Sequence, residues 1–211
     1  MIVLPDEWER GVTQQNLFGE PPAQAANGKG ARKPGQPLLH TWFFALRPAI
    51  EDARRIRAFA EELLSSHGVS GKRIDPERLH ITLELVGHDV DDAVVEAACC
   101  AADAISFPVI EARFDAAMTF SAPSGPLVLL GTEGLDEVRG LRTALGCAMA
   151  DRGFAPPRSY EPHMTLCYDA KHRLARTRIE PIGFQAREFA LVKSYIGFSR
   201  HEVLRTWQLA G

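Results

Sequence analysis

Two short stretches decide how this chain can fold: PERLHITLELVG at residues 76–87 and YEPHMTLCYD at residues 160–169. In the first, apolar residues at alternate positions are separated by His80, Thr82 and Glu84. A period of two is typical of a β-strand that buries one face, so these polar side chains are predicted to share the other face. One outward histidine in such a strand is usually only solvated.

The second stretch repeats the pattern. His163 and Thr165 alternate with apolar residues, and both stretches read histidine, apolar residue, threonine, leucine. The repeat makes a chance arrangement much harder to accept than it is for a single motif. It directs attention to two His-x-Thr pairs as the candidate functional residues.

The elements around the two motifs also repeat. A predicted strand, a helix with one apolar stripe and a loop rich in Gly, Pro and Arg precede each motif. We predict strands over 38–46, 107–120, 126–131, 188–198 and 201–209, and helices over 48–66, 91–105 and 135–152. This order predicts an α+β, bilobal fold. Its two pseudo-two-fold related lobes would be antiparallel sheet with helices packed outside, and the motifs would face each other across a central cleft.

Composition excludes several classes of protein. The chain has 211 residues, a net charge of −3 and 45% hydrophobic residues, which suits one globular domain without a global basic field for nucleic acid. No apolar run is long enough to span a bilayer, and the N-terminus lacks a signal-peptide pattern. The four cysteines have no metal-ligand spacing and are interpreted as reduced thiols. We expect a cytoplasmic monomer with no membrane contact.

Residues 1–37 differ from the rest of the chain. They are rich in Gly, Pro and polar residues without periodicity, so we predict a flexible tail followed by one domain over 38–211. Within the tail, QQNLF at 14–18 looks like the short peptide with which bacterial proteins dock on the replication sliding clamp. The alternative, a segment that packs back on the domain or has no role, is favoured.

Two histidines and two threonines on facing strands suit displacement at phosphorus. One neutral imidazole can take a proton from the nucleophile while the other, protonated, gives a proton to the leaving oxygen. The threonine hydroxyls can donate to non-bridging oxygens as negative charge develops. No cluster of Asp, Glu and His accompanies the pairs, so we expect metal-free chemistry without a cofactor.

The chain resembles the 2H phosphoesterases, in particular the group of 2′-5′ RNA ligases and RNA 2′,3′-cyclic phosphodiesterases. The resemblance covers about 38–209 and is carried by TWFFALRP (41–48), the two motif stretches, and LVKS with HEVLRTWQL (191–209). It implies that His80 and His163 are catalytic and that Thr82 and Thr165 bind phosphate. It also implies hydrolysis of a 2′,3′-cyclic phosphate on RNA or nucleotides to a 2′-phosphate, without a metal.

Several assignments stay open. The residues do not decide which histidine is acid and which is base, although His80 as acid is our working assignment. Phe44, Tyr160, Arg158 and Tyr168 are candidate substrate contacts, and Tyr168 stands where many members carry Arg. Lys72, Arg73 and Arg78 are candidates for a basic rim, whereas His201, which stands where Tyr is common, is expected to be solvent-exposed. Two alternatives remain: reversible 2′-5′ ligation, and an RNA-binding or clamp-docked module without turnover.

Overall fold

The computed structural model of the chain describes residues 38–155 and 159–210. The predicted tail at 1–37, its clamp-like segment 14–18 and the candidate contact Arg158 therefore lie outside the described residues. Among the residues described, no helix has the length and apolar character needed to cross a membrane.

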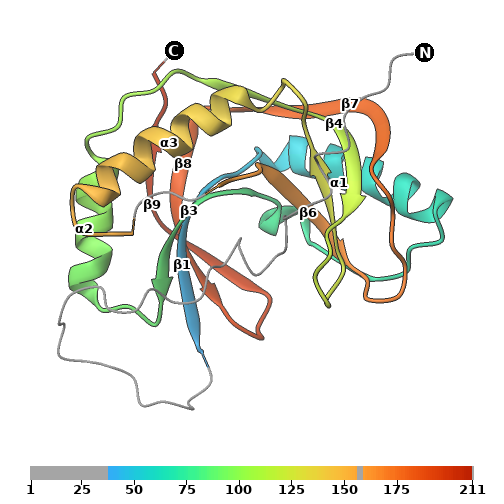
Figure 1. Cartoon of the computed structure of the whole chain (residues 1–211), viewed down its shortest axis with the longest axis horizontal. Coiled ribbons are helices and arrows are strands. Elements are labelled where there is room, and N and C mark those ends of the chain that lie inside the picture. Colours follow the sequence, from blue (N-terminus) through green and yellow to red (C-terminus); the bar gives the residue numbers. More distant parts are fainter. Residues whose placement is uncertain (1–37, 156–158, 211) are drawn as a thin grey trace.

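A nine-stranded sheet with antiparallel strand pairs forms the centre of the fold (Figure 1). Its order is β7-β4-β5-β6-β3-β1-β8-β9, and the short β2 pairs with β6. The strands are β1 His40–Leu46, β2 Lys72–Arg73, β3 Ile81–His88, β4 Ile110–Thr119, β5 Pro126–Leu130, β6 His163–Tyr168, β7 Thr177–Ala186, β8 Glu188–Tyr195 and β9 Arg200–Gln208. One half of the sheet lies on each side of the β3–β6 junction, which confirms the predicted α+β fold with two similar halves.

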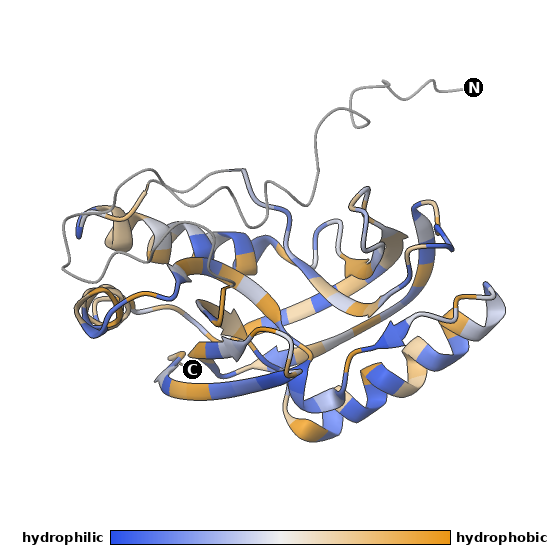
Figure 2. Cartoon of the chain, turned by 90° about the horizontal axis from the view of Figure 1, so that it is seen from below, coloured by the Kyte–Doolittle hydropathy of each residue, from blue (hydrophilic) through white to orange (hydrophobic). Residues whose placement is uncertain are grey.

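Three helices bury their apolar stripes against one face of this sheet: α1 Ile50–Ser66, α2 Asp92–Ala102 and α3 Asp136–Ala150. Helices α2 and α3 contact β3, whereas α1 crosses to the other half and contacts β7 (Figure 1). Figure 2 shows hydrophobic and hydrophilic residues alternating around these helices, as a one-sided core requires. The shared core contains Phe44, Ile81 and Met164 from the central strands.

The opposite face of the sheet carries the two motifs, and we call it the histidine face, after His80, Thr82, His163 and Thr165. Two smaller apolar clusters lie to either side of the motifs on this face. One comprises Phe43, Ala45, Ala190 and Val192, and the other comprises Ala116, Phe120, Val128 and Leu130. Each cluster comes from one half of the sheet, so the motifs lie between two apolar walls.

Each motif strand has one extra residue directly after its threonine. In β3 the partners of Ala45 and Phe44 are Thr82 and Glu84, so Leu83 is unpaired as a β-bulge. In β6 the corresponding residue is Leu166, because Val128 and Leu127 pair with Thr165 and Cys167. The two bulges occupy equivalent positions in the two halves.

The bulges reverse the alternation that the sequence predicted. Glu84 does not share the face of His80, because it turns to the helix face and pairs with Arg142 of α3 at 3.0 Å. Leu85 and Tyr168 take the histidine face instead: Leu85 packs in the Phe43 cluster, and Tyr168 shares a side-chain hydrogen bond with Thr165. The predicted placement of Glu84 was wrong because strict alternation assumes an unbroken ladder.

Strand β7 was not predicted. Its sequence TRIEPIGFQA contains Pro181 and Gly183, which argue against a strand. The structure places it at the edge of the sheet, next to β4 alone, where a missing N–H group is tolerated. The short β2 lies in a segment that the sequence indicated as loop.

Candidate active site

The two motifs meet where β3 and β6 pair at Ile81 and Met164, the one residue pair of this junction. Both of these side chains are buried in the core. The antiparallel register around this pair places His80 beside Thr165 and Thr82 beside His163, on the histidine face. The motifs thus lie side by side in one continuous sheet, rather than on separate sheets that face each other.

Both histidines are held in the same way by the backbone that precedes them. The Nδ1 atom of His80 lies 2.6 Å from the carbonyl oxygen of Arg78, and that of His163 lies 2.9 Å from the carbonyl oxygen of Glu161. A carbonyl can only accept, so Nδ1 carries the hydrogen in both rings. In the neutral rings, Nε2 is then the atom with the free lone pair, which suits proton transfer.

Each motif histidine packs against an aromatic ring. The Phe43 ring centroid lies 5.1 Å from that of His80, and the Phe120 centroid lies 5.0 Å from that of His163. His201 of β9 adds a third ring at 5.3 Å from His80, in an edge-to-face arrangement. His201 was expected in solvent, but pairing with β8, the neighbour of β1, brings it onto the histidine face.

Phe44 was predicted to contact substrate, but the structure places its side chain in the core. Its side chain is 0% exposed and packs in the helix-side core against Phe189 and Trp207. Its neighbour Phe43 takes the place next to His80, because successive side chains of a strand point to opposite faces. Alternation along 41–46 offered a signal for this choice, but it does not say which parity is inward.

The histidines lie in an environment that disfavours their charged form. Burial lowers the pKa of His80 to about 4, and the charges of Arg47, Arg78 and, when it is protonated, His163 act in the same direction, although the hydrogen bond to the Arg78 carbonyl opposes them. Burial also lowers the pKa of His163. Burial, with His80, Arg78 and Arg47, lowers the pKa of His201 to about 3. All three rings are therefore neutral at pH 7 in the free protein.

Two arginines supply positive charge next to His80. Arg47 follows β1 and donates from Nη2 to the Glu77 carbonyl at 2.8 Å. Arg78 ends the short helix η2 (Pro76–Arg78), and its buried Nε has no hydrogen-bond partner among the described residues. A buried unpaired guanidinium N–H next to imidazoles suits an anionic ligand. Sequence reasoning proposed Arg78 for a basic rim but missed Arg47.

Other predicted contacts divide between the two faces. Tyr160 was predicted to contact substrate, but its ring packs against the helix-side core under Arg142. Its hydroxyl donates to the Thr82 carbonyl at 2.7 Å. It supports the β3–β6 junction rather than facing a ligand. Arg73 is also turned away, since it pairs with Glu61 of α1 at 3.3 Å. Lys72 shares the histidine face, because it pairs directly with Tyr168 across β2 and β6.

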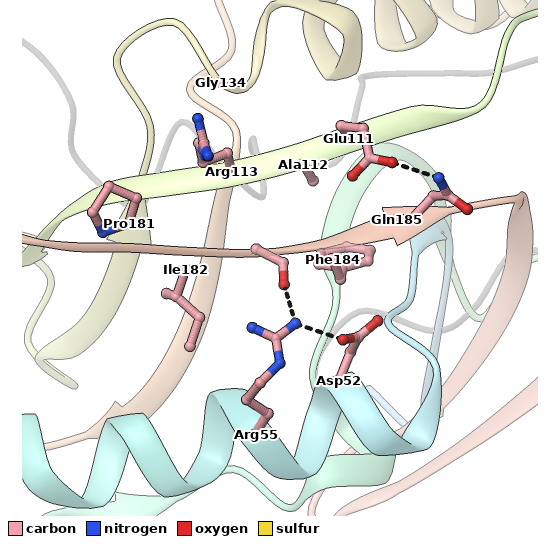
Figure 3. Close-up of a pocket in the computed structure, with 11 residues that line it drawn as sticks. Asp52, Arg55, Glu111, Ala112, Arg113, Gly134, Pro181, Ile182, Phe184 and Gln185 are labelled. Atoms are coloured by element: carbon pink, nitrogen blue, oxygen red, sulfur yellow. Dashed lines mark hydrogen bonds and ion pairs between the residues drawn. The ribbon is translucent and has the colours of Figure 1, made fainter.

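The hollow drawn in Figure 3 is separate from this site. It lies between α1, β4 and β7, where Arg55 donates to Asp52 and to the Gly183 carbonyl, and Gln185 donates to Glu111. None of the motif residues lines it. Within 38–155 and 159–210, no group of three or more His, Cys, Asp or Glu side chains is arranged to hold a metal ion.

Known structures share this fold. A phosphoesterase matches with 24% identity and a TM-score of 0.65, over 83% of this chain and 100% of its own. E. coli LigT in complex with 3′-AMP gives the same four values. The protein TT0787 of Thermus thermophilus matches with 20% identity and a TM-score of 0.62, over 81% of this chain and 98% of its own. No curated protein matches the sequence significantly.

The sequence itself carries a family signature. The pattern of the 2′-5′ RNA ligase superfamily matches residues 43–195, which include both His-x-Thr motifs and both bulges. That range spans most of the chain and the whole histidine face as far as β8. The chain therefore belongs to the 2′-5′ RNA ligase superfamily, the 2H phosphoesterases.

Proposed function

We propose that this protein hydrolyses 2′,3′-cyclic phosphates at RNA or nucleotide ends to 2′-phosphates, with His80 and His163 as general acid and base. One observation carries the proposal: two histidines with the same Nδ1–H tautomer flank the Ile81–Met164 pair, and the antiparallel register sets each beside the threonine of the other motif. Two proton-transfer groups and two hydroxyl donors around one point suit in-line displacement at phosphorus.

In the proposed step, a water oxygen attacks the phosphorus and its proton passes to Nε2 of the neutral histidine. The bond from phosphorus to O3′ breaks, and O3′ receives a proton from Nε2 of the protonated histidine. The products are a 3′-hydroxyl and a 2′-phosphate, so atoms and charge balance without a further reactant. Thr82 and Thr165 donate to the non-bridging oxygens as negative charge develops on them.

Binding of the substrate anion next to Arg47 and Arg78 would allow one histidine to become protonated for this step. In the free protein, burial and then the cations Arg47 and Arg78 disfavour the charged form of His80. A phosphodiester anion bound next to these cations neutralises their field and favours an imidazolium. E. coli LigT, which shares the fold, has been crystallised with phosphate and with 3′-AMP, a phosphomonoester, and both ligands carry phosphoryl oxygens with negative charge.

The test uses an RNA oligonucleotide that ends in a 2′,3′-cyclic phosphate, incubated with the protein in EDTA. We expect a 2′-phosphate end, and a rate loss of at least about 100-fold in His80→Ala and in His163→Ala. His67→Ala is the matched control, because His67 is an exposed histidine at the end of α1. Equal rates in all variants would contradict the two-histidine mechanism.

The same active site can serve a second nucleophile. If the 5′-hydroxyl of a second RNA replaces water, its oxygen attacks the phosphorus, the bond from phosphorus to O3′ breaks, and the product is a 2′-5′ linkage with a free 3′-hydroxyl, the ligation in the superfamily's name. Adding such an acceptor to the assay separates hydrolysis from ligation by product length. If the wild type binds the RNA but produces neither product, a binding module becomes the better description.

A further inference from the structure

The turn between β8 and β9 carries an exposed phenylalanine near the proposed site. Phe198 is 77% exposed, more than any other large hydrophobic side chain among the described residues. A single exposed apolar residue is common and by itself indicates nothing. Phe198 differs because the turn that carries it contacts residues of the histidine face.

The turn is tied to the motif strands from two sides. Lys72 of β2 donates from Nζ to the Ser199 hydroxyl at 3.1 Å, and Lys72 is the strand partner of Tyr168. On the other side, His201 continues into β9 and packs on His80. Phe198 lies within this turn, three residues before His201 and directly before Ser199, the residue that Lys72 contacts. The turn therefore borders the histidine face.

The charges near the turn suit a nucleic-acid strand. Lys72 lies on the histidine face at one end, and Arg47 and Arg78 lie next to His80 and His201. The chain as a whole has a net charge of −3, so the presence of these three cations on one face is a local feature. Proteins that bind single strands combine cations for the phosphates with aromatic rings on which bases stack.

Resting on the proposed function above, we propose that this turn is a subsite for the nucleotide preceding the cyclic end. Phe198 would stack its base and Lys72 would contact its phosphate. The subsite would make single-stranded RNA ends, rather than free cyclic mononucleotides, the preferred substrate class. Stacking on a phenyl ring accepts every base, so the subsite selects for chain length and not for sequence.

The experiment compares a 2′,3′-cyclic mononucleotide with a short single-stranded RNA that ends in the same cyclic nucleotide. We expect the wild type to prefer the RNA in kcat/KM. Phe198→Ala should reduce this preference by at least about five-fold, the lower end of what one stacked base contributes. Leu204→Ala, which removes another exposed apolar side chain of β9, is the matched control and should leave the preference intact.

Lys72→Ala tests the phosphate contact. Loss of one cation–phosphate contact to a single strand should reduce the slope of log kcat/KM against log salt by about 0.7 for the RNA. Arg54→Ala, which removes an exposed cation on α1, should leave that slope unchanged. Equal losses on both substrates, or an unchanged preference in Phe198→Ala, would overturn the subsite.

Binding separates this inference from the proposed catalysis. Fluorescence anisotropy with single-stranded RNA ending in a 2′-phosphate reports the subsite even when the wild type turns over neither substrate. Weaker binding of Phe198→Ala than of Leu204→Ala would then support the subsite while the proposed reaction fails. Equal affinities of the two variants would overturn the subsite.

Discussion

The imidazole rings of His80 and His201 lie edge to face, 5.3 Å apart between centroids, although His80 directly precedes β3 and His201 lies in β9, far away in the chain. Phe43 contacts both, at 5.1 Å from His80 and 5.7 Å from His201. The rings of Phe43 and His201 cover one side of His80, and burial is the largest cause of its low pKa.

Replacement of His201 tests this relationship. His201→Ala should admit water and raise the pKa of His80 from about 4 toward the ordinary value of 6.5. His201→Phe keeps a ring there and should keep the pKa low, while Arg47, Arg78 and His163 stay in place. NMR titration of the His80 imidazole measures its pKa in both variants. An unchanged pKa in His201→Ala would contradict the inference that His201 shields His80 from water.

Anion binding should be coupled to proton uptake. The pKa values of His80 and His163 are lowered in the free protein, and a bound anion near Arg47 and Arg78 favours the charged rings. Sulfate is a useful probe because its own charge does not change near neutral pH. Calorimetry should show tighter sulfate binding as the pH falls, and a smaller pH dependence in His80→Gln. Affinity independent of pH would mean that the anion does not bind beside the histidines.

A leaving group that needs no proton can assign the acid. If His80 protonates the leaving oxygen, as in our working assignment, His80→Ala should be far less impaired on a p-nitrophenyl phosphodiester than on the cyclic RNA end. His163→Ala should be impaired on both, because it would still lack the base. The opposite result would exchange the two roles without affecting the two-histidine mechanism.

The ion pair between Arg142 and Glu84 predicts a stability effect. Arg142→Met leaves the Glu84 carboxylate without its partner on the helix face, at an expected loss of about 3–5 kcal/mol in the free energy of unfolding. Burial raises the pKa of Glu84 and Arg142 opposes that rise, so the variant's carboxyl should take up a proton more readily. The loss should therefore shrink as the pH falls through this raised pKa. Urea unfolding at about pH 5 and at neutral pH measures this, and equal losses at both would contradict it.

Most elements were predictable because their periodicity is strong. Strand β1, helix α1 and helix α3 each show the apolar pattern of a one-sided core, and the structure contains them at His40–Leu46, Ile50–Ser66 and Asp136–Ala150. Strand β7 was missed since Pro181 is tolerated within a strand only at a sheet edge or a bulge, and both depend on how the strand pairs with β4.

The sequence by itself determined that two His-x-Thr pairs lie on amphipathic strands in a repeated α+β framework, because alternation and repetition are local properties. Only the tertiary structure decided that Ile81 meets Met164, that bulges at Leu83 and Leu166 reverse the faces beyond the threonines, and that His201 packs on His80. These relationships depend on strand register and on contacts between distant segments. Side-chain alternation within one segment carries no information on either.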